Sequence, residues 1–386
     1  MKTVDEKKVV LVVDDAPANI RIVNEILHDT YKVRIATNGA KGLELASGTP
    51  APDLILLDVV MPGMDGYDVC KNLKTNPSTR DIPVIFLTGQ TESTDETKGF
   101  EVGAVDYIHK PFSPAVVAAR VQTHLALRDT REKLERQLEA IQRELETARQ
   151  IQLSILPPEV PRIPGLDMAA RYLPMTSVAG DFYDFVVIDE KRLGVLVADV
   201  SGHGMPAALI ASMLKVAFAA QSEHAGDPAS VLSGLNQALC GKFKDHYVTA
   251  VYALIDVERR CVRYAGAGHP PLLLRGRRPG ETRYVLENGL FLGYFPEAQY
   301  SAGETPFEEG DWVVLYTDGI PEMMNDAEEQ FGRDRLKAFL DEHSGLDAAG
   351  LADHLLEHLT QWSGATSGQE ADDDMTLVAV HFRPDA

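Results

Sequence analysis

The sequence predicts three parts in order: an α/β domain built on a five-stranded parallel sheet, a long helix, and an α+β domain. Short apolar runs alternate with helical stretches over residues 7–112, which is typical of a doubly wound sheet covered on both faces. Residues 113–156 contain no glycine, and no proline follows Pro114 there, so this stretch can form one helix. Beyond residue 160, strands and helices follow without strict alternation, which indicates a layered domain with antiparallel strands. The predicted parts are residues 1–124, 125–156 and 157–386.

Composition and charge limit the classes of function. The chain has 386 residues and a net charge of −21, and residues 157–386 carry 35 acidic but only 18 basic side chains. Nucleic-acid phosphates would be repelled by such a surface, so direct DNA or RNA binding is not expected. We expect no secretory leader and no membrane segment, because no apolar run is long enough to cross a bilayer. Three cysteines without a CxxC pair indicate a reduced, cytoplasmic protein without a zinc site.

The apolar runs of the first domain are expected to form its strands. They cover Val9–Val13, Lys32–Ala36, Leu54–Leu57, Val84–Leu87 and Tyr107–Ile108. The residues that follow these runs include Asp14, Asp15, Asp58, Thr88 and Lys110. Because the carboxyl ends of parallel strands meet at one edge of a sheet, these side chains should converge. Three carboxylates gathered there need a cation, and a hydroxyl and an ammonium beside them suit the oxygens of a phosphoryl group.

This segment, with its LVVDD, LLDVVMPGMDG, LTG and HKPF motifs, resembles the receiver domain of two-component response regulators over residues 7–125. The resemblance implies that a histidine kinase or a phosphotransfer protein phosphorylates Asp58. It also implies a Mg²⁺ site formed by Asp14, Asp15, Asp58 and the carbonyl of Val60.

The same resemblance assigns roles around the phosphorylation site. Thr88 and Lys110 would contact the phosphoryl oxygens. Thr88 and Tyr107 would be the switch residues, with an ordinary edge-packed tyrosine as an equally favoured alternative for Tyr107. Val60 and Gln90 occupy positions that vary among receivers and that set the lifetime of the phosphorylated state.

Apolar residues recur at spacings of three, four and seven along the predicted helix, from Leu127 to Ile155. This spacing favours a coiled-coil seam in its second half, and with it a homodimer formed through the helix. Arg131 and Gln152 fall on the seam and make it imperfect. A single helix packed within its own chain is the alternative.

The last domain combines strands with acidic turns. Its strands are expected at Gly194–Ala198, Val248–Ile255, Cys261–Ala265, Leu272–Leu274, Trp312–Thr317 and Met375–Phe382, and its helices at 205–221, 228–243, 332–343 and 347–362. Four acidic stretches, VAGDFYD, VADVSGHG, LYTDG and ADDDMT, lie at run ends or in turns of small residues. Oxygen ligands without cysteine or paired histidines favour Mg²⁺ or Mn²⁺. Two such ions about 3.5–4 Å apart can activate water for attack on a phosphate.

Those four stretches, in that order, resemble the SpoIIE/RsbU-type branch of the metal-dependent type-2C protein phosphatases, whose fold is a β-sandwich flanked by helices. The resemblance covers residues 145–382 and includes ETARQIQLSILP, YVTAVYALID, AGAGHPP, GLFLG and DDMTLVAV. It implies two Mn²⁺ or Mg²⁺ ions bridged by Asp199, with the carbonyl of Val200 on one of them. The remaining ligands would be Asp181, Asp318 and Asp373.

Several residues near these stretches have less certain roles. Within Asp372–Asp374, Asp374 is the second choice as a metal ligand. His203 lies four residues after Asp199, whereas type-2C enzymes with an Asp-Gly-His-Gly motif place their histidine two residues after the aspartate. A loop-shaping histidine is therefore favoured over a general acid. Asp184 is expected to accept hydrogen bonds rather than to bind a metal.

Three further positions concern the shape of the loops. His269, in AGAGHPP, is expected to stabilise a turn. Ala179 stands where the family usually has a glycine, and Phe291 stands where it usually has a proline. Neither replacement removes a ligand, but both affect loop geometry and the entry of the substrate.

These features predict a response-regulator phosphatase in which activated water attacks phosphoserine or phosphothreonine directly. The resemblance implies that the substrate is a STAS-type anti-sigma-factor antagonist, in a circuit with a serine-kinase anti-sigma factor. Phosphorylation of Asp58 would act through the linker helix, with either sign of control open. The alternative is a catalytically silent adaptor that binds a sigma or anti-sigma factor. The retained carboxylates argue against an adaptor, because an unpaired carboxylate cluster is costly without metals.

Overall fold

The computed structural model describes residues 7–89, 98–175, 178–277, 281–285, 287–364 and 373–383. The chain forms two compact units, Met1–Ile141 and Gln142–Ala386. The boundary between them falls within helix α5 (Pro114–Ile155). Among the described residues, none of the helices combines the length and the apolar character needed to cross a bilayer.

The first unit is an α/β fold around one parallel sheet with the strand order β2-β1-β3-β4-β5. Its described elements are β1 (Val9–Val13), α1 (Pro17–Leu27), β2 (Lys32–Ala36), α2 (Gly39–Ala46), β3 (Leu54–Asp58), α3 (Gly66–Thr75), β4 (Val84–Thr88), β5 (Asp106–His109) and the first part of α5. The strands predicted from the sequence are therefore confirmed. Their parallel register places the carboxyl ends of β1, β3 and β4 at one edge of the sheet.

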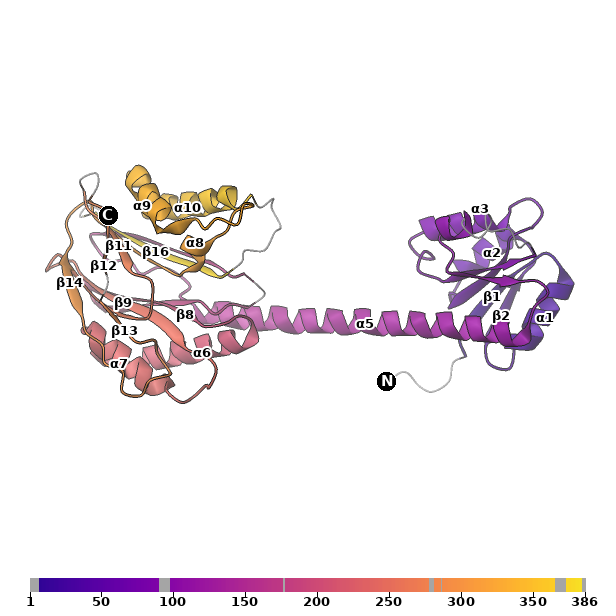
Figure 1. The fold of residues 1–386 in the computed structure, drawn as a ribbon, viewed down its shortest axis with the longest axis horizontal. Coiled ribbons are helices and arrows are strands. Elements are labelled where there is room, and N and C mark those ends of the chain that lie inside the picture. Colours follow the sequence, from indigo (N-terminus) through magenta and orange to yellow (C-terminus); the bar gives the residue numbers. More distant parts are fainter. Residues whose placement is uncertain are drawn as a thin grey trace. The chain divides into compact units, whose positions relative to one another are not determined.

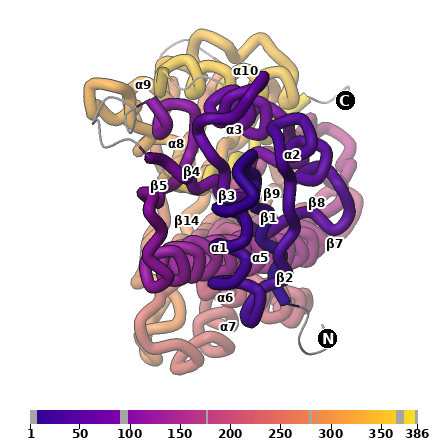
Figure 2. The backbone as a smooth tube through the Cα atoms, turned by 90° about the vertical axis from the view of Figure 1, so that its right-hand side faces the viewer, coloured from indigo at the N-terminus to yellow at the C-terminus, as the bar shows by residue number. Residues whose placement is uncertain are grey.

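Helices cover both faces of this sheet (Figure 2). On one face, α2 and α3 pack through residues that include Leu57 and Val69. On the other face, α1 and α5 pack through residues that include Val12, Val23 and Val121. Because both faces are buried, central strands such as β1 are apolar at every position rather than alternating.

Helix α5 is continuous over 42 residues, which confirms the long helix predicted for residues 113–156. Pro114 stands at its first position, where the missing N–H is not needed for helical hydrogen bonding. Ion pairs one turn apart, such as Arg131 with Glu135, support its exposed surface. The apolar stripe that predicts a coiled coil is exposed, with fractions of 64% for Leu127, 65% for Leu134, 55% for Leu138 and 54% for Ile141.

The second unit contains two sheets made mostly of antiparallel pairs. The first has the order β13-β10-β9-β8-β7, with β14 also paired to β10, and the second has the order β12-β11-β15-β16-β6. The strands of the first sheet are β7 (Phe182–Asp189), β8 (Arg192–Val200), β9 (Val248–Asp256), β10 (Cys261–Ala267), β13 (Asn288–Gly289) and β14 (Gly303–Pro306). Those of the second are β6 (Leu166–Leu173), β11 (Leu272–Arg275), β12 (Arg283–Val285), β15 (Trp312–Tyr316) and β16 (Met375–Phe382).

Helices flank the two sheets of this unit on opposite sides (Figure 1). They are α6 (Met205–Ala219), α7 (Pro228–Leu239), α8 (Gly319–Glu322), α9 (Gly332–His343) and α10 (Ala348–Trp362), with a short 3₁₀ turn at Ser222–His224. One core joins both sheets to α6 and α7 and includes Leu196, Leu214 and Val380. A second core packs α9 and α10 against the sheet that contains β11, β15 and β16. The helix-flanked β-sandwich implied by the resemblance is thus confirmed.

Two details differ from the sequence prediction. The predicted strands leave out β6, β7, β12, β13 and β14, and the first four of these stand at the ends of the two strand orders. The helix expected over 228–243 ends at Leu239, because Cys240 leaves the helical region with ψ 130° and Gly241 adopts a positive φ of 74°. This early end places residues 240–247 in a loop before β9.

Candidate functional site

Carboxylates converge at one edge of the parallel sheet in the first unit. Asp14 and Asp15 follow β1, and Asp58 ends β3. One ligand oxygen of each lies within 4.8 Å of the others, and no other group of three or more acidic, histidine or cysteine side chains in the described ranges is this compact. Asp14 and Asp58 are buried, whereas Asp15 is exposed. This donor set of oxygens fits Mg²⁺.

Lys110 lies among these carboxylates. Its Nζ is 3.0 Å from Asp14 Oδ2 and 2.9 Å from Asp58 Oδ2. Burial raises the pKa of Asp58, the Lys110 hydrogen bond opposes that rise, and the charge of Asp14 adds to it. The Lys110 ammonium beside Asp58 therefore favours the charged form of this carboxylate.

The remaining predicted receiver residues surround the same edge. Thr88 ends β4 and is buried. The Tyr107 ring is 7% exposed, with its centroid 4.9 Å from that of Phe100 and 6.1 Å from that of Phe86. The Val60 side chain is 74% exposed, so only its backbone carbonyl could serve the site. Gln90 lies outside the described residues.

The carboxylates predicted for the second unit come from both sheets. Asp181 immediately precedes β7, and Asp199 is the second-last residue of β8. Asp318 follows β15, and Asp373 lies shortly before β16. Phe182 pairs with Ala198, which places Asp181 beside Asp199. The backbone N–H of Thr317 donates to the carbonyl of Thr376, which brings the ends of β15 and β16 together.

Asp181 is fully enclosed by protein. Its Oδ2 accepts hydrogen bonds from Thr317 Oγ1 at 2.8 Å and from Thr376 Oγ1 at 2.6 Å. Burial and the charge of Asp199 raise the pKa of Asp181 well above its ordinary value, and the two threonine hydroxyls oppose the rise. The threonines also connect Asp181, on the first sheet, to the second sheet.

Asp199 is surrounded by like charges. Burial and then Asp318, Asp373 and Asp374 raise the pKa of Asp199 to about 8. Burial and Asp373 raise the pKa of Asp318. None of the ion pairs between described residues joins Lys or Arg to Asp181, Asp199 or Asp318. Oxygen donors that repel one another and lack a basic partner fit divalent cations, and ligands spread over two ions need not share one 4.8 Å cluster.

Asp374 has a different position from Asp373. The Asp374 carboxylate accepts a hydrogen bond from the N–H of Met175 at 2.7 Å and from that of Gly180 at 2.6 Å. Both its oxygens are therefore used to hold the loop that leads to Asp181. Asp373 is close enough to Asp199 and Asp318 to raise their pKa values, whereas Asp372 lies outside the described residues.

Three other residues singled out by the sequence differ in their contacts and exposure. Asp184 Oδ2 forms an ion pair with Lys215 Nζ at 2.9 Å, and its Oδ1 accepts from the N–H of Phe185. His203 is exposed in the loop after β8. His269 is buried, with Nδ1 2.8 Å from Thr249 Oγ1 and Nε2 3.1 Å from the carbonyl of Tyr316.

The hydrogen bonds of His269 fix its tautomer. A carbonyl oxygen can only accept, so Nε2 carries the proton and Nδ1 accepts from the threonine hydroxyl. Burial lowers the pKa of His269 to about 3, so the ring stays neutral. His269 thus links β9, through Thr249, to the end of β15 just before Asp318.

Gln152, near the end of α5, is a residue whose role sequence reasoning missed. It is 6% exposed; its Nε2 donates to the carbonyl of Ala179 at 2.6 Å, and its Oε1 accepts from the N–H of Ala179 at 3.0 Å. Ala179 precedes Gly180 and Asp181. The polar residue that interrupts the heptad pattern therefore holds the backbone of the carboxylate loop.

Gln152→Leu is expected to lower the free energy of unfolding by about 2 kcal/mol, because it leaves a buried N–H and a buried carbonyl without partners. Metal-dependent turnover should fall about tenfold as the loop before Asp181 loosens. Urea unfolding and phosphomonoester hydrolysis measure the two effects. Gln150→Leu is the matched control, since Gln150 is exposed and its side chain bonds that of the exposed Glu146. Equal urea midpoints for Gln152→Leu and wild type would contradict the role.

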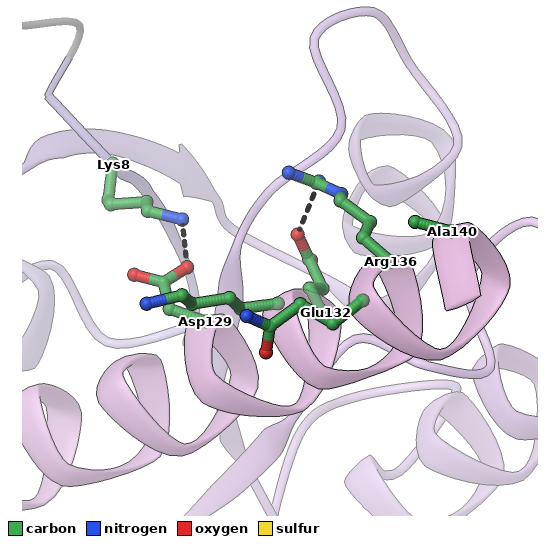
Figure 3. Close-up of a pocket in the computed structure, with 7 residues that line it drawn as sticks. Lys8, Asp129, Glu132, Arg136 and Ala140 are labelled. Carbon is green, nitrogen blue, oxygen red and sulfur yellow. Dashed lines mark hydrogen bonds and ion pairs between the residues drawn. The ribbon is translucent and has the colours of Figure 1, made fainter. Parts of the chain in front are cut away.

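A surface hollow of about 450 Å³ in the first unit contains none of the predicted site residues (Figure 3). It is lined by Lys8, Asp129, Glu132, Lys133, Arg136, Gln137 and Ala140. Lys8 pairs with Asp129, and Arg136 with Glu132, so several of its charges neutralise one another. This hollow is therefore not a candidate for the active site.

Sequence families match both units. The family described as response regulator receiver domain matches residues 10–122. The family described as stage II sporulation protein E (SpoIIE) matches residues 189–383, which hold Asp199, Asp318 and Asp373. The chain belongs to the SpoIIE family. Its second unit is accordingly a metal-dependent protein serine phosphatase domain, here preceded by a receiver.

Individual relatives agree with this family. "Phosphoserine phosphatase RsbU" of Bacillus subtilis is 31% identical over 243 residues, which is 62% of this chain and 70% of RsbU. "Phosphoserine phosphatase RsbP" of the same organism is 32% identical over 46% of this chain and 45% of RsbP. A "probable cyclic di-GMP phosphodiesterase" of Vibrio cholerae is 48% identical over 116 residues, and this chain spans only 26% of it.

A solved structure supports the fold of the second unit. The SiaA-PP2C domain of Pseudomonas aeruginosa is similar with a TM-score of 0.55 at 23% identity, over 64% of this chain and 98% of that one. At this identity the likeness concerns the fold alone.

Proposed function

We propose that this SpoIIE-family phosphatase removes phosphate from phosphoserine or phosphothreonine on a STAS-type anti-sigma-factor antagonist, under the control of Asp58. The observation that carries the catalytic part is a group of carboxylates that no ion pair among the described residues joins to a lysine or arginine: buried Asp181, half-buried Asp199 and Asp318, and exposed Asp373. Such a group is unfavourable by itself and favourable around divalent cations. The catalytically silent adaptor is disfavoured for the same reason.

The residues divide the catalytic work among them. Asp199 would hold two Mn²⁺ or Mg²⁺ ions together with the carbonyl of Val200, Asp181, Asp318 and Asp373. When bound, these ions supply a lowered pKa for a water molecule and positive charge for the phosphoryl oxygens. Thr317 and Thr376 orient Asp181, and Asp374 and Gln152 hold the loop before it. Water would attack the phosphorus directly, the bond from phosphorus to the serine oxygen would break, and inorganic phosphate and the serine hydroxyl would leave.

The first unit would act as the receiver. A histidine kinase or phosphotransfer protein would phosphorylate Asp58, with Mg²⁺ held by Asp14, Asp15, Asp58 and the Val60 carbonyl. Lys110 and Thr88 would bind the phosphoryl oxygens, and Thr88 and Tyr107 would respond to them.

The receiver would occupy residues 1–124, the linker 125–156 and the phosphatase 157–386. Signal would pass through α5, which is one uninterrupted helix. The exposed stripe on α5 supports a homodimer formed through the linker, and the cysteine content supports a cytoplasmic location.

The experiment measures phosphate release from a serine-phosphorylated STAS-domain protein, with Mn²⁺ or with EDTA and with or without beryllofluoride and Mg²⁺. We expect Mn²⁺-dependent release that beryllofluoride changes severalfold. The adaptor would be favoured if neither the STAS-domain protein nor a small phosphomonoester released phosphate and the chain bound no Mn²⁺. A rate of release that beryllofluoride does not change would support the phosphatase activity but contradict control by the receiver.

A further inference from the structure

An exposed aromatic patch lies in the second unit. We define the aromatic patch as Tyr247, Leu290, Phe291, Tyr294 and Phe295. Tyr247, Leu290 and Tyr294 are 40%, 50% and 56% exposed. The Phe291 ring centroid lies 4.3 Å from that of Tyr247, 5.8 Å from that of Tyr294 and 5.3 Å from that of Phe295. The four rings thus form one continuous cluster, and the exposed Leu290 precedes Phe291 in the chain.

The patch adjoins the loop that carries Asp199 and Val200. The N–H of Tyr247 donates to Ser201 Oγ, and the N–H of Ser201 donates to the carbonyl of Tyr247, each at 2.9 Å. On the other side, Leu292 and Val248 exchange backbone hydrogen bonds of 2.8 and 3.1 Å. The patch is therefore fixed to the carboxyl end of β8, the same strand end that presents Asp199.

The buried packing of this loop depends on Leu292 and not on the exposed side chains of the aromatic patch. Leu292, between Phe291 and Gly293, supplies the buried contact of this loop and has no exposed surface. Gly293 has a positive φ of 88°, and a Cβ there would lie 2.6 Å from the Phe243 ring. The turn is thus built to direct Leu292 inward while Leu290 and Tyr294 remain on the surface.

Charge near the patch favours an anionic partner. Lys242 and Lys244 are exposed in the loop that leads to Tyr247, and the Nδ1 of His246 bonds the carbonyl of Ser201 at 2.7 Å. The same loop carries the exposed Asp245, so its exposed side chains leave one net positive charge in a part of the chain with 35 acidic and 18 basic side chains. An apolar surface flanked by lysines suits a protein segment that carries both a phosphate and an apolar side chain.

We propose that the aromatic patch is a specificity subsite that binds an apolar side chain adjacent to the phosphoserine of the protein substrate. The proposal rests on the proposed phosphatase function and adds the sequence preference of the active site. A residue held in the patch would position the neighbouring phosphoserine toward the Asp199 loop.

The test uses the full-length protein with Mn²⁺ and three probes. Two are phosphoserine peptides that differ only in carrying leucines or serines at the positions flanking the phosphoserine. The third is N-acetyl-phosphoserine methylamide, which has no flanking side chain. The variants are Leu290→Ser and Tyr294→Ser, both at exposed positions, with Val187→Ser as a control that removes a side chain 53% exposed on β7.

We expect wild type and Val187→Ser to prefer the leucine peptide about tenfold in kcat/KM. Leu290→Ser and Tyr294→Ser should reduce this preference to about twofold, through KM, and leave turnover of the methylamide unchanged. Equal kcat/KM for both peptides in wild type, or an unchanged preference in the variants, would overturn the subsite. Variants that change sedimentation but not the preference between the peptides would also overturn the subsite, since the patch would then join two copies of the chain. No Mn²⁺-dependent turnover of the methylamide would instead overturn the phosphatase proposal and the subsite with it.

Discussion

Asp199→Asn should lower Mn²⁺-dependent hydrolysis of a phosphomonoester about a thousandfold or more. Asp199 lies among Asp318, Asp373 and Asp374, whose charges act on it directly. An amide in its place would provide one neutral oxygen donor instead of a charged carboxylate, which would weaken the proposed binding of two cations. Initial rates over a range of Mn²⁺ concentrations measure the loss and separate weaker metal binding from slower turnover.

The same substitution should stabilise the protein when metal is removed by a chelator. The pKa of Asp199 is about 8 in the folded state, compared with about 3.9 in an unfolded chain. Between these values the folded state holds more protons, so its stability falls as pH rises from about 4 to 8. Asparagine removes this loss, and we expect a melting temperature about 5 °C above that of wild type at pH 8. With Mn²⁺ present, wild type should have the higher melting temperature of the two.

Asp245→Asn is the control, because Asp245 is an exposed carboxylate in the loop before β9. It should leave turnover and metal-free stability within experimental error of wild type. Turnover by Asp199→Asn within tenfold of wild type would remove Asp199 from the catalytic centre. A lower metal-free melting temperature would show that repulsion among the carboxylates does not dominate the site.

Asp58→Asn should abolish the incorporation of phosphate from acetyl phosphate into the first unit, by at least a hundredfold. Asp58 is the carboxylate that Lys110 contacts at 2.9 Å and that shares a compact oxygen cluster with Asp14 and Asp15. An amide is not a nucleophile toward phosphorus, and the other two carboxylates would serve the cation. Intact-mass measurement of the protein after incubation with acetyl phosphate and Mg²⁺ detects the added phosphate.

Asp81→Asn provides the matched control, since the Asp81 side chain is 67% exposed and pairs only with surface arginines. It should accept phosphate as wild type does. Asp58→Asn should also remove any effect of beryllofluoride on phosphatase rate while preserving the basal rate. Phosphate found on Asp58→Asn at wild-type levels would move the acceptor to another residue.

The sequence was sufficient for the strands that are buried on both faces or end in acidic turns. β1 and β8 are nearly continuous apolar runs, and continuous runs are what two covered faces require. β6 and β7 were missed because they lie at sheet edges and mix buried with half-buried residues, without the alternation that marks a strand.

Side chains that hold the second site together were harder to predict. Asp374 stands in a run of identical residues, and its role depends on N–H groups 199 and 194 residues away in sequence. Gln152 looked like a flaw in a heptad pattern, because its partner Ala179 is 27 residues away. Local spacing contains no information about such partners, and only the folded pairing of α5 with the loop before β7 supplies it.

The lifetime of the protein in a cell, and not only its activity, should depend on the supply of manganese or magnesium. Ions that bind the folded carboxylate centre and not the unfolded chain add about 1.4 kcal/mol of stability for each tenfold rise in free concentration above the dissociation constant. The mutual repulsion of Asp181, Asp199 and Asp318 makes the metal-free fold the less stable form. Proteases that act on unfolded chains would then remove this phosphatase first from metal-starved cells, so scarcity would reduce its abundance along with its catalytic rate.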